Sequence, residues 1–68
     1  MKIETISGIK TTLVKQLIKT HNFTQQSYAD EIGLSRQGLL RILKDGSTRL
    51  VTAERMAEVF NLKVEDIT

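Results

Sequence analysis

The chain contains no cysteine and no proline, and aromatic residues make up only 4% of its 68 residues. Without cysteine there is no disulfide framework and no thiolate metal site. A chain of this length forms one domain with a small core, so its stability must come from helix packing or from oligomerisation. We therefore expect one compact domain that holds no metal ion and no cofactor.

Long apolar segments are missing as well. No stretch approaches the roughly 20 apolar residues that a membrane span requires. The first six residues, MKIETI, are too polar for a secretory signal. The chain has no glycine-rich phosphate loop and no nucleophile motif. We therefore expect a cytoplasmic protein that is not an enzyme, with no membrane partner, no catalytic residues and no small-molecule substrate.

The charge is unevenly placed along the chain, whose net charge at pH 7 is +2. Residues 1–49 contain eight Lys or Arg and four Asp or Glu (+4), and residues 50–68 contain two and four (−2). A basic end suits a polyanion, because neutralised phosphates release their counterions. On charge alone, lysines that solvate helix faces are the better explanation, so the function has to come from the motifs.

Apolar spacing predicts four helices and a short final turn. The first and fourth span about residues 9–21 and 52–60, with Ser7 as the expected N-cap of the first. The second lies between Thr24 and Gly33, and the third lies between Ser35 and residues 45–47. The predicted inward residues recur at helical spacing along these segments: Ile9, Leu13, Val14, Leu17, Ile18, Tyr28, Ala29, Ile32, Leu39, Ile42, Leu43, Ala53, Met56, Ala57 and Phe60.

Local signals fix the ends of the two middle helices. Phe23, Thr24 and Tyr28 have the spacing of a hydrophobic staple around a threonine cap. Gly33 ends the second helix because that position usually needs a positive φ. Ser35 caps the third helix only two residues later. Asn22 and Asn61 are the expected ends of the first and fourth helices.

The segment before the first helix is less regular. Ile3 and Ile6 do not alternate strictly, so residues 1–8 are an N-terminal arm, a short edge strand or part of a dimer contact. We place the folded domain at residues 9–68. Leu62, Val64 and Ile67 predict a last turn that packs back on the core.

Residues 25–44, QQSYADEIGLSRQGLLRILK, combine the features of a helix-turn-helix. A small residue, Ala29, stands where two helices would cross closely, and Gly33 makes the turn. The third helix keeps its apolar side toward the second. Arg36, Gln37 and Arg41 fall on the face away from Leu39 and Ile42, because residues i, i+1 and i+5 lie within about 140° of one another at about 3.6 residues per turn. Arginine suits guanine edges in the major groove and glutamine suits adenine edges.

The sequence resembles the lambda-repressor/Cro family of helix-turn-helix regulators. The residues that carry the resemblance lie along nearly the whole chain: Phe23, Thr24, Gln25, Tyr28, Ala29, Ile32, Gly33, Leu34, Ser35, Leu39, Ile42, Met56, Ala57, Phe60, Asn61, Leu62 and Val64. The resemblance implies an all-α fold of four or five compact helices. It also implies binding to a double-stranded DNA operator.

The resemblance also implies roles for individual residues. Arg36, Gln37 and Arg41 correspond to base-reading positions of the family, and Leu40 either touches a thymine methyl or is buried. The expected phosphate contacts flank this helix: Thr24, Gln25, Ser35, Lys44, Ser47, Thr48 and Arg49. Residues 47–49 could equally form only a polar loop. Gly46 comes one residue later than the glycine that usually closes this helix, and Leu40 and Leu43 stand where polar residues are common.

Several other residues have ordinary explanations. His21 is expected at a helix end rather than in a metal site, since it has no carboxylate partner at ligand spacing. Asp30 and Glu31 are adjacent, so they point in different directions and suit a solvated face better than acid–base catalysis. The staple spacing makes core packing a better account of Phe23 and Tyr28 than base stacking.

The small size, with no sensor domain, is more typical of a Cro-type repressor of phage or bacterial origin than of a full-length repressor. An antitoxin of the same fold and an interaction domain that has lost DNA binding are the alternatives. We expect weak homodimers on DNA, because one recognition helix reads only a few base pairs. Leu62, Val64 and Ile67 are the preferred dimer surface, and Ile3 and Ile6 are the alternative.

Overall fold

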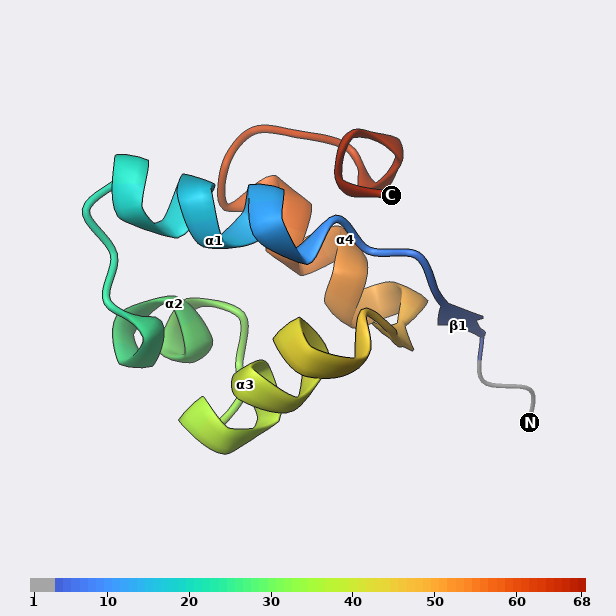
Figure 1. Cartoon of the computed structure of the whole chain (residues 1–68), viewed down its shortest axis with the longest axis horizontal. Helices are drawn as coiled ribbons and strands as arrows, with labels where there is room; N and C mark the ends of the chain where they lie inside the picture. Colours follow the sequence, from blue (N-terminus) through green and yellow to red (C-terminus); the bar gives the residue numbers. More distant parts are fainter. Residues whose placement is uncertain (1–3) are drawn as a thin grey trace.

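Four α-helices make up most of the fold in the computed structural model, which describes residues 4–68 (Figure 1). The elements follow in the order β1 (Thr5–Ile6), α1 (Thr11–Thr20), α2 (Gln25–Glu31), α3 (Arg36–Asp45), β2 (Thr48–Arg49), α4 (Leu50–Glu58) and the 3₁₀ turn η1 (Val64–Ile67). The predicted all-α class is confirmed. Ile3 lies outside the described residues.

The predicted starts of α2 and α3 are confirmed by their caps. The Thr24 hydroxyl oxygen accepts a hydrogen bond from the Ser27 N–H at 3.0 Å. The Ser35 hydroxyl oxygen accepts one from the Gly38 N–H at 3.1 Å. The rings of Phe23 and Tyr28 have centroids 5.8 Å apart, as the staple requires. These local bonds satisfy N–H groups that lack a partner within the helix.

The prediction that Ser7 caps α1 is wrong. The helix begins at Thr11, and its N-cap is Lys10, which makes no side-chain cap bond. Distant backbone groups hold the chain just before the helix, since the Ile9 N–H donates to the Gly46 oxygen at 3.0 Å and the Lys10 N–H donates to the Ile67 oxygen at 2.7 Å. These bonds keep the segment out of helical geometry.

The predicted bounds of α4 also need correction. The helix begins at Leu50, two residues earlier than expected, and ends at Glu58. It follows β2 directly, and the Leu50 N–H donates to the Glu4 oxygen at 2.9 Å. Strand pairing therefore runs straight into the first turn of the helix. Asn61 has a φ of 58°, consistent with the predicted reversal after the helix.

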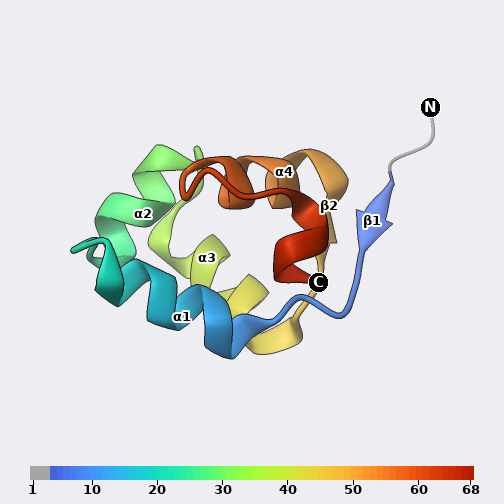
Figure 2. The ribbon, with the colours of Figure 1, turned by 90° about the horizontal axis from the view of Figure 1, so that it is seen from above.

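Two short strands form a pair, and one of them, β2, lies in the segment 47–49 for which a polar loop was one of the predictions. β1 and β2 are antiparallel, with Thr5 opposite Arg49 and Ile6 opposite Thr48. This pair ties the segment before α1 to the start of α4. β1 lies at one end of the molecule, outside β2 (Figures 1 and 2).

The core contains nearly all of the predicted inward residues. Those that are buried are Ile9, Val14, Ile18, Tyr28, Ala29, Ile32, Leu39, Ile42, Leu43, Ala53, Met56, Ala57, Phe60 and Ile67. Leu13 and Leu17 are half-buried instead. α3 packs on α2 and α1, and η1 packs on α4 and α1, so that α1 bridges the two halves (Figure 2).

Tyr28 is the largest fully buried side chain. Its ring stacks on Phe60 with centroids 5.2 Å apart. Its hydroxyl donates a hydrogen bond to the Met56 carbonyl oxygen at 2.9 Å. Burial raises the pKa of this hydroxyl far above its ordinary value, so it remains a donor. The side chain thereby fixes α2 to α4.

Replacing Ala29 with leucine should destabilise the fold. Ala29 has no exposed surface, so extra methylene groups would overpack the core at a cost of about 1–3 kcal/mol. Urea unfolding would measure the loss. Glu31→Leu, on the exposed side of the same helix, is the control and should change stability little. Equal stability of the two variants would show that Ala29 has spare room.

Candidate nucleic-acid interface

A tight turn at Gly33 sets the direction of α3 relative to α2. Gly33 has a φ of +76°, and its N–H donates to the Asp30 oxygen at 3.2 Å. The Leu34 N–H then reaches back to the Ala29 oxygen at 2.8 Å. α3 begins at Arg36, just two residues after Leu34. The end of α2 is thus bonded to the segment that leads into α3.

The inner face of α3 is fixed in the core. Leu39 is fully buried, and Ile42 and Leu43 are almost so. Leu43, at a position where the related family is commonly polar, therefore enlarges the core. Because three residues in the middle and last turns anchor the helix, its opposite face is held rigidly toward solvent.

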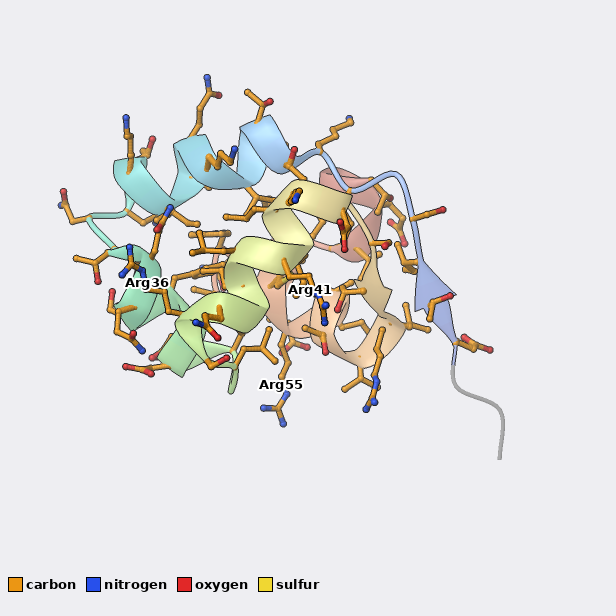
Figure 3. The ribbon with its side chains drawn as sticks, turned by 60° about the horizontal axis from the view of Figure 1, so that its bottom comes forward. Arg36, Arg41 and Arg55 are labelled. Carbon is orange, nitrogen blue, oxygen red and sulfur yellow. The ribbon has the colours of Figure 1, made fainter. Side chains whose placement is uncertain are left out.

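That outer face presents the four predicted base-reading residues together. Arg36, Gln37 and Arg41 are exposed. Leu40, for which the sequence left burial open, is 37% exposed and shares this face. Arg36 projects from the first turn of α3 and Arg41 from its middle, toward opposite sides of the helix (Figure 3). Two cations, an amide and an apolar side chain are thus available on one helix surface.

A shallow hollow lies beside the first turns of α3. Ser35, Gln37, Gly38 and Arg41 line it. Gly38 leaves this surface low, and a Cβ there would lie 3.3 Å from the Ser35 hydroxyl oxygen. Because Gly38 has no side chain, the edge of a ligand in this hollow can approach the helix backbone closely.

The predicted phosphate contacts occur at four places, three of which are helix ends. Thr24 and Gln25 stand at the start of α2, and Ser35 stands at the start of α3. The hydroxyl oxygens of Thr24 and Ser35 already cap their helices. Lys44 is exposed in the last turn of α3.

The remaining predicted phosphate contacts belong to the segment between α3 and α4. Ser47 and Arg49 are exposed, whereas Thr48 is half-buried within β2. The structure therefore turns part of the expected polar loop into a paired strand and leaves the Arg49 side chain in solvent.

Arg55 adds a cation that sequence reasoning missed. It belongs to α4 and is exposed, yet a Cβ on Gly33 would lie 3.5 Å from its Nη1 atom. Its side chain extends past the rim of the surface that carries Arg41 (Figure 3). No spacing rule within α4 links this position to the turn between α2 and α3, so only the folded structure brings them together.

Negative charge gathers on a different part of the molecule. A groove along α4 and η1 is lined by Leu50, Glu54, Glu58, Leu62, Lys63, Val64 and Glu65. In Figure 1, η1 and α3 lie on opposite sides of the molecule. The separation leaves the α3 side basic, which suits a polyanion on that side.

Other chemistry finds little support in the described part of the chain. Residues 4–68 contain no cluster of three or more His, Cys, Asp or Glu side chains suited to a metal ion. His21 is exposed at the end of α1, with its ring 4.9 Å from that of Phe60. Asp30 accepts a hydrogen bond from the Gln26 amide at 3.0 Å, as expected of a solvated face. None of the helices in residues 4–68 has the length and apolar character needed to cross a membrane.

Comparison with known families identifies the arrangement. A helix-turn-helix family model matches residues 14–67, which is most of the chain. The chain therefore belongs to the helix-turn-helix family of the lambda-repressor-like type, whose members are DNA-binding transcription regulators. Searches of curated proteins and of solved structures each gave no significant match.

Replacing Gly33 with alanine should strain the turn. A left-handed backbone costs a residue with a Cβ about 1–2 kcal/mol, although Gly33 has room for the extra atom. Gly33→Asn is the matched control, because asparagine tolerates this conformation better. Thermal unfolding should rank the wild type above the asparagine variant and the alanine variant last. If both variants lost the same stability, backbone strain would not be the cause.

Proposed function

We propose that this protein is a Cro-like repressor of phage or bacterial type that binds a palindromic operator, with α3 in the major groove. The observation that carries the proposal is the exposed polar face of α3, whose opposite face is anchored in the core by Leu39, Ile42 and Leu43. In helix-turn-helix proteins the second helix of the motif enters the groove, with its N-terminal residues at the base edges.

Each side chain of this face has a chemistry suited to base edges. Arg36 and Arg41 can each donate two hydrogen bonds to a guanine, and Gln37 can pair with an adenine. Leu40 offers an apolar contact for a thymine methyl group. Arg36 and Gln37 stand at the N-terminal end of α3, which enters the groove first.

The flanking residues are proposed to position the helix rather than to read sequence. Lys44 and Arg49 carry charge to the phosphates beyond the end of α3. Thr24, Gln25, Ser35, Ser47 and Thr48 contribute polar groups to the same role. Such contacts fix orientation on the duplex and carry no base information directly. Arg55, at the rim of this surface, is a further candidate for a phosphate contact.

A two-fold symmetric operator implies two copies of the protein. The sequence favoured Leu62, Val64 and Ile67 as the dimer surface. The burial of Ile67, which is only 1% exposed and belongs to the monomer core, weakens this prediction. Val64 and Leu62 are half-buried. Ile67 is therefore not available for a dimer contact, and Leu62 and Val64 offer only part of their surface.

Selection of bound sites from a random pool of duplex DNA tests the whole proposal. A symmetric site with two half-sites, each matching the chemistry of α3, is the expected result. Recovery of no sequence preference at any salt concentration would overturn the proposal and favour a domain that binds only protein.

Changing Arg36 to alanine should lower affinity for the selected site by about 1–3 kcal/mol and relax preference at one base pair of each half-site. Arg36→Lys is the control, since lysine keeps the charge but loses the bidentate geometry. Titration of matched and mutated duplexes would measure both effects. An equal loss on selected and random DNA would make Arg36 a backbone contact.

Changing Lys44 to alanine should weaken binding to all sequences alike. One lost phosphate contact lowers the slope of log affinity against log salt by about one unit per bound copy. Lys63→Ala is the matched control, because Lys63 is exposed beside the acidic groove. An unchanged slope for Lys44→Ala would remove this residue from the interface.

A further inference from the structure

The outer edge of β1 has the geometry of a pairing surface. β1 and β2 are antiparallel with Thr5 opposite Arg49, and the Leu50 N–H donates to the Glu4 oxygen at 2.9 Å. In an antiparallel pair, successive residues direct their backbone groups to alternate sides. The backbone N–H and C=O groups of Glu4 and Ile6 therefore point toward β2. Those of Thr5 point away from β2, to the outer edge.

This edge lies at one end of the molecule. The fold measures 36 × 23 × 19 Å, and β1 stands at an extreme of the longest dimension (Figure 1). Seen from above, β1 lies outside β2 and runs across the long dimension rather than along it (Figure 2). Among residues 4–68 no other element lies beyond β1 at this end, so a second strand can approach Thr5 there.

We propose that β1 pairs with β1 of a second copy of this chain, with Thr5 opposite Thr5 on a two-fold axis. The β1–β2 pairs of the two copies then form one four-stranded antiparallel sheet. This inference rests on the proposed operator-binding function and specifies its dimer contact.

The orientation of β1 makes this pairing compatible with DNA. A two-fold axis that is perpendicular to both the strand and the long dimension reverses β1, as antiparallel pairing requires. The same axis leaves α3 on one side of the dimer in both copies, since α3 lies along the lower side in Figure 1. Both recognition helices would then face the same side of a duplex.

The length of the molecule supports the same arrangement. Copies joined end to end have centres separated by about the longest dimension, 36 Å. Half-sites on successive turns of B-DNA are about 34–36 Å apart. Copies joined across the 23 Å or 19 Å dimensions would have centres too close for that spacing. End-to-end pairing through β1 is therefore an arrangement that fits one helical turn.

The side chains of β1 accept this register. With Thr5 opposite Thr5, Glu4 lies opposite Ile6 of the second copy, so the two Glu4 carboxylates are not opposite one another. Paired threonines are favourable across strands. A strand this short supplies few hydrogen bonds, so the contact is weak in solution. It forms when adjacent half-sites raise the effective concentration of the two copies.

A proline at position 5 tests the backbone contact. Thr5→Pro removes the outward N–H, and proline is tolerated in an edge strand where that N–H faces solvent. Thr5→Ala keeps the N–H and is the matched control. The proline variant should keep its melting temperature and its affinity for a lone half-site, while its Kd for the palindrome rises about tenfold, or 1.4 kcal/mol. Thr5→Ala should bind the palindrome nearly as wild type does.

A disulfide tests the proximity of the two strands. The chain has no cysteine, so Thr5→Cys introduces a single thiol. Directly opposite residues in a hydrogen-bonded antiparallel pair have Cα atoms about 5.5 Å apart, within the disulfide range. Mild oxidation on palindromic DNA should yield a covalent dimer. Thr20→Cys, at an exposed position at the end of α1, is the control and should remain monomeric.

The outcomes separate this inference from the function on which it rests. If Thr5→Pro leaves palindrome affinity unchanged, or if Thr5→Cys fails to crosslink while two copies bind the palindrome, the dimer uses another surface and the inference is overturned alone. If the wild type binds neither half-site nor palindrome, the proposed function fails and the inference fails with it.

Discussion

The close approach of α2 and α3 is the constraint on which the rest of the structure depends. It requires a residue with almost no side chain at Ala29, which is fully buried, and a left-handed turn at Gly33. The Leu34 N–H then bonds to the Ala29 oxygen, which fixes the start of α3 against the end of α2. Because protein interiors are close-packed, this geometry leaves α3 little freedom to rotate. A fixed rotation is what assigns some of its residues to the core and others to solvent.

The core holds this motif through α4. Tyr28 joins α2 to α4 by its hydrogen bond to Met56 and by stacking on Phe60. A chain with few aromatic residues thus concentrates them at one junction, where they bury large areas and have defined geometry. The exposed residues of α3 do not take part in core packing. They can therefore be of types that suit the ligand without a loss of stability. Stability and recognition are therefore separated between two faces of one helix.

Local signals made much of the fold predictable. The caps at Thr24 and Ser35 and the turn at Gly33 depend on residues a few positions apart, so short spacings in the sequence predict them. The starts of α1 and α4 were not predictable in this way, because they are set by backbone bonds from Ile9, Lys10 and Leu50 to distant carbonyls. The position of Arg55 was not predicted for the same reason, since Arg55 comes close to Gly33 only when α4 packs in the folded structure. The roles of the α3 side chains remain predictions, since they depend on a ligand that the chain alone does not include.

The short ribbon of β1 and β2 connects these two levels. It ties the segment before α1 to the first turn of α4, so the end of the molecule moves with the core that holds α3. A contact between copies made through this ribbon would transmit a fixed spacing to both recognition helices. A contact made through a flexible arm would not, because the spacing would vary with the arm. Since one α3 offers only a few base contacts, discrimination between sites depends on both helices meeting their half-sites together. A weak but rigid contact serves that purpose better than a strong flexible one, because it increases affinity only for half-sites that have the correct spacing.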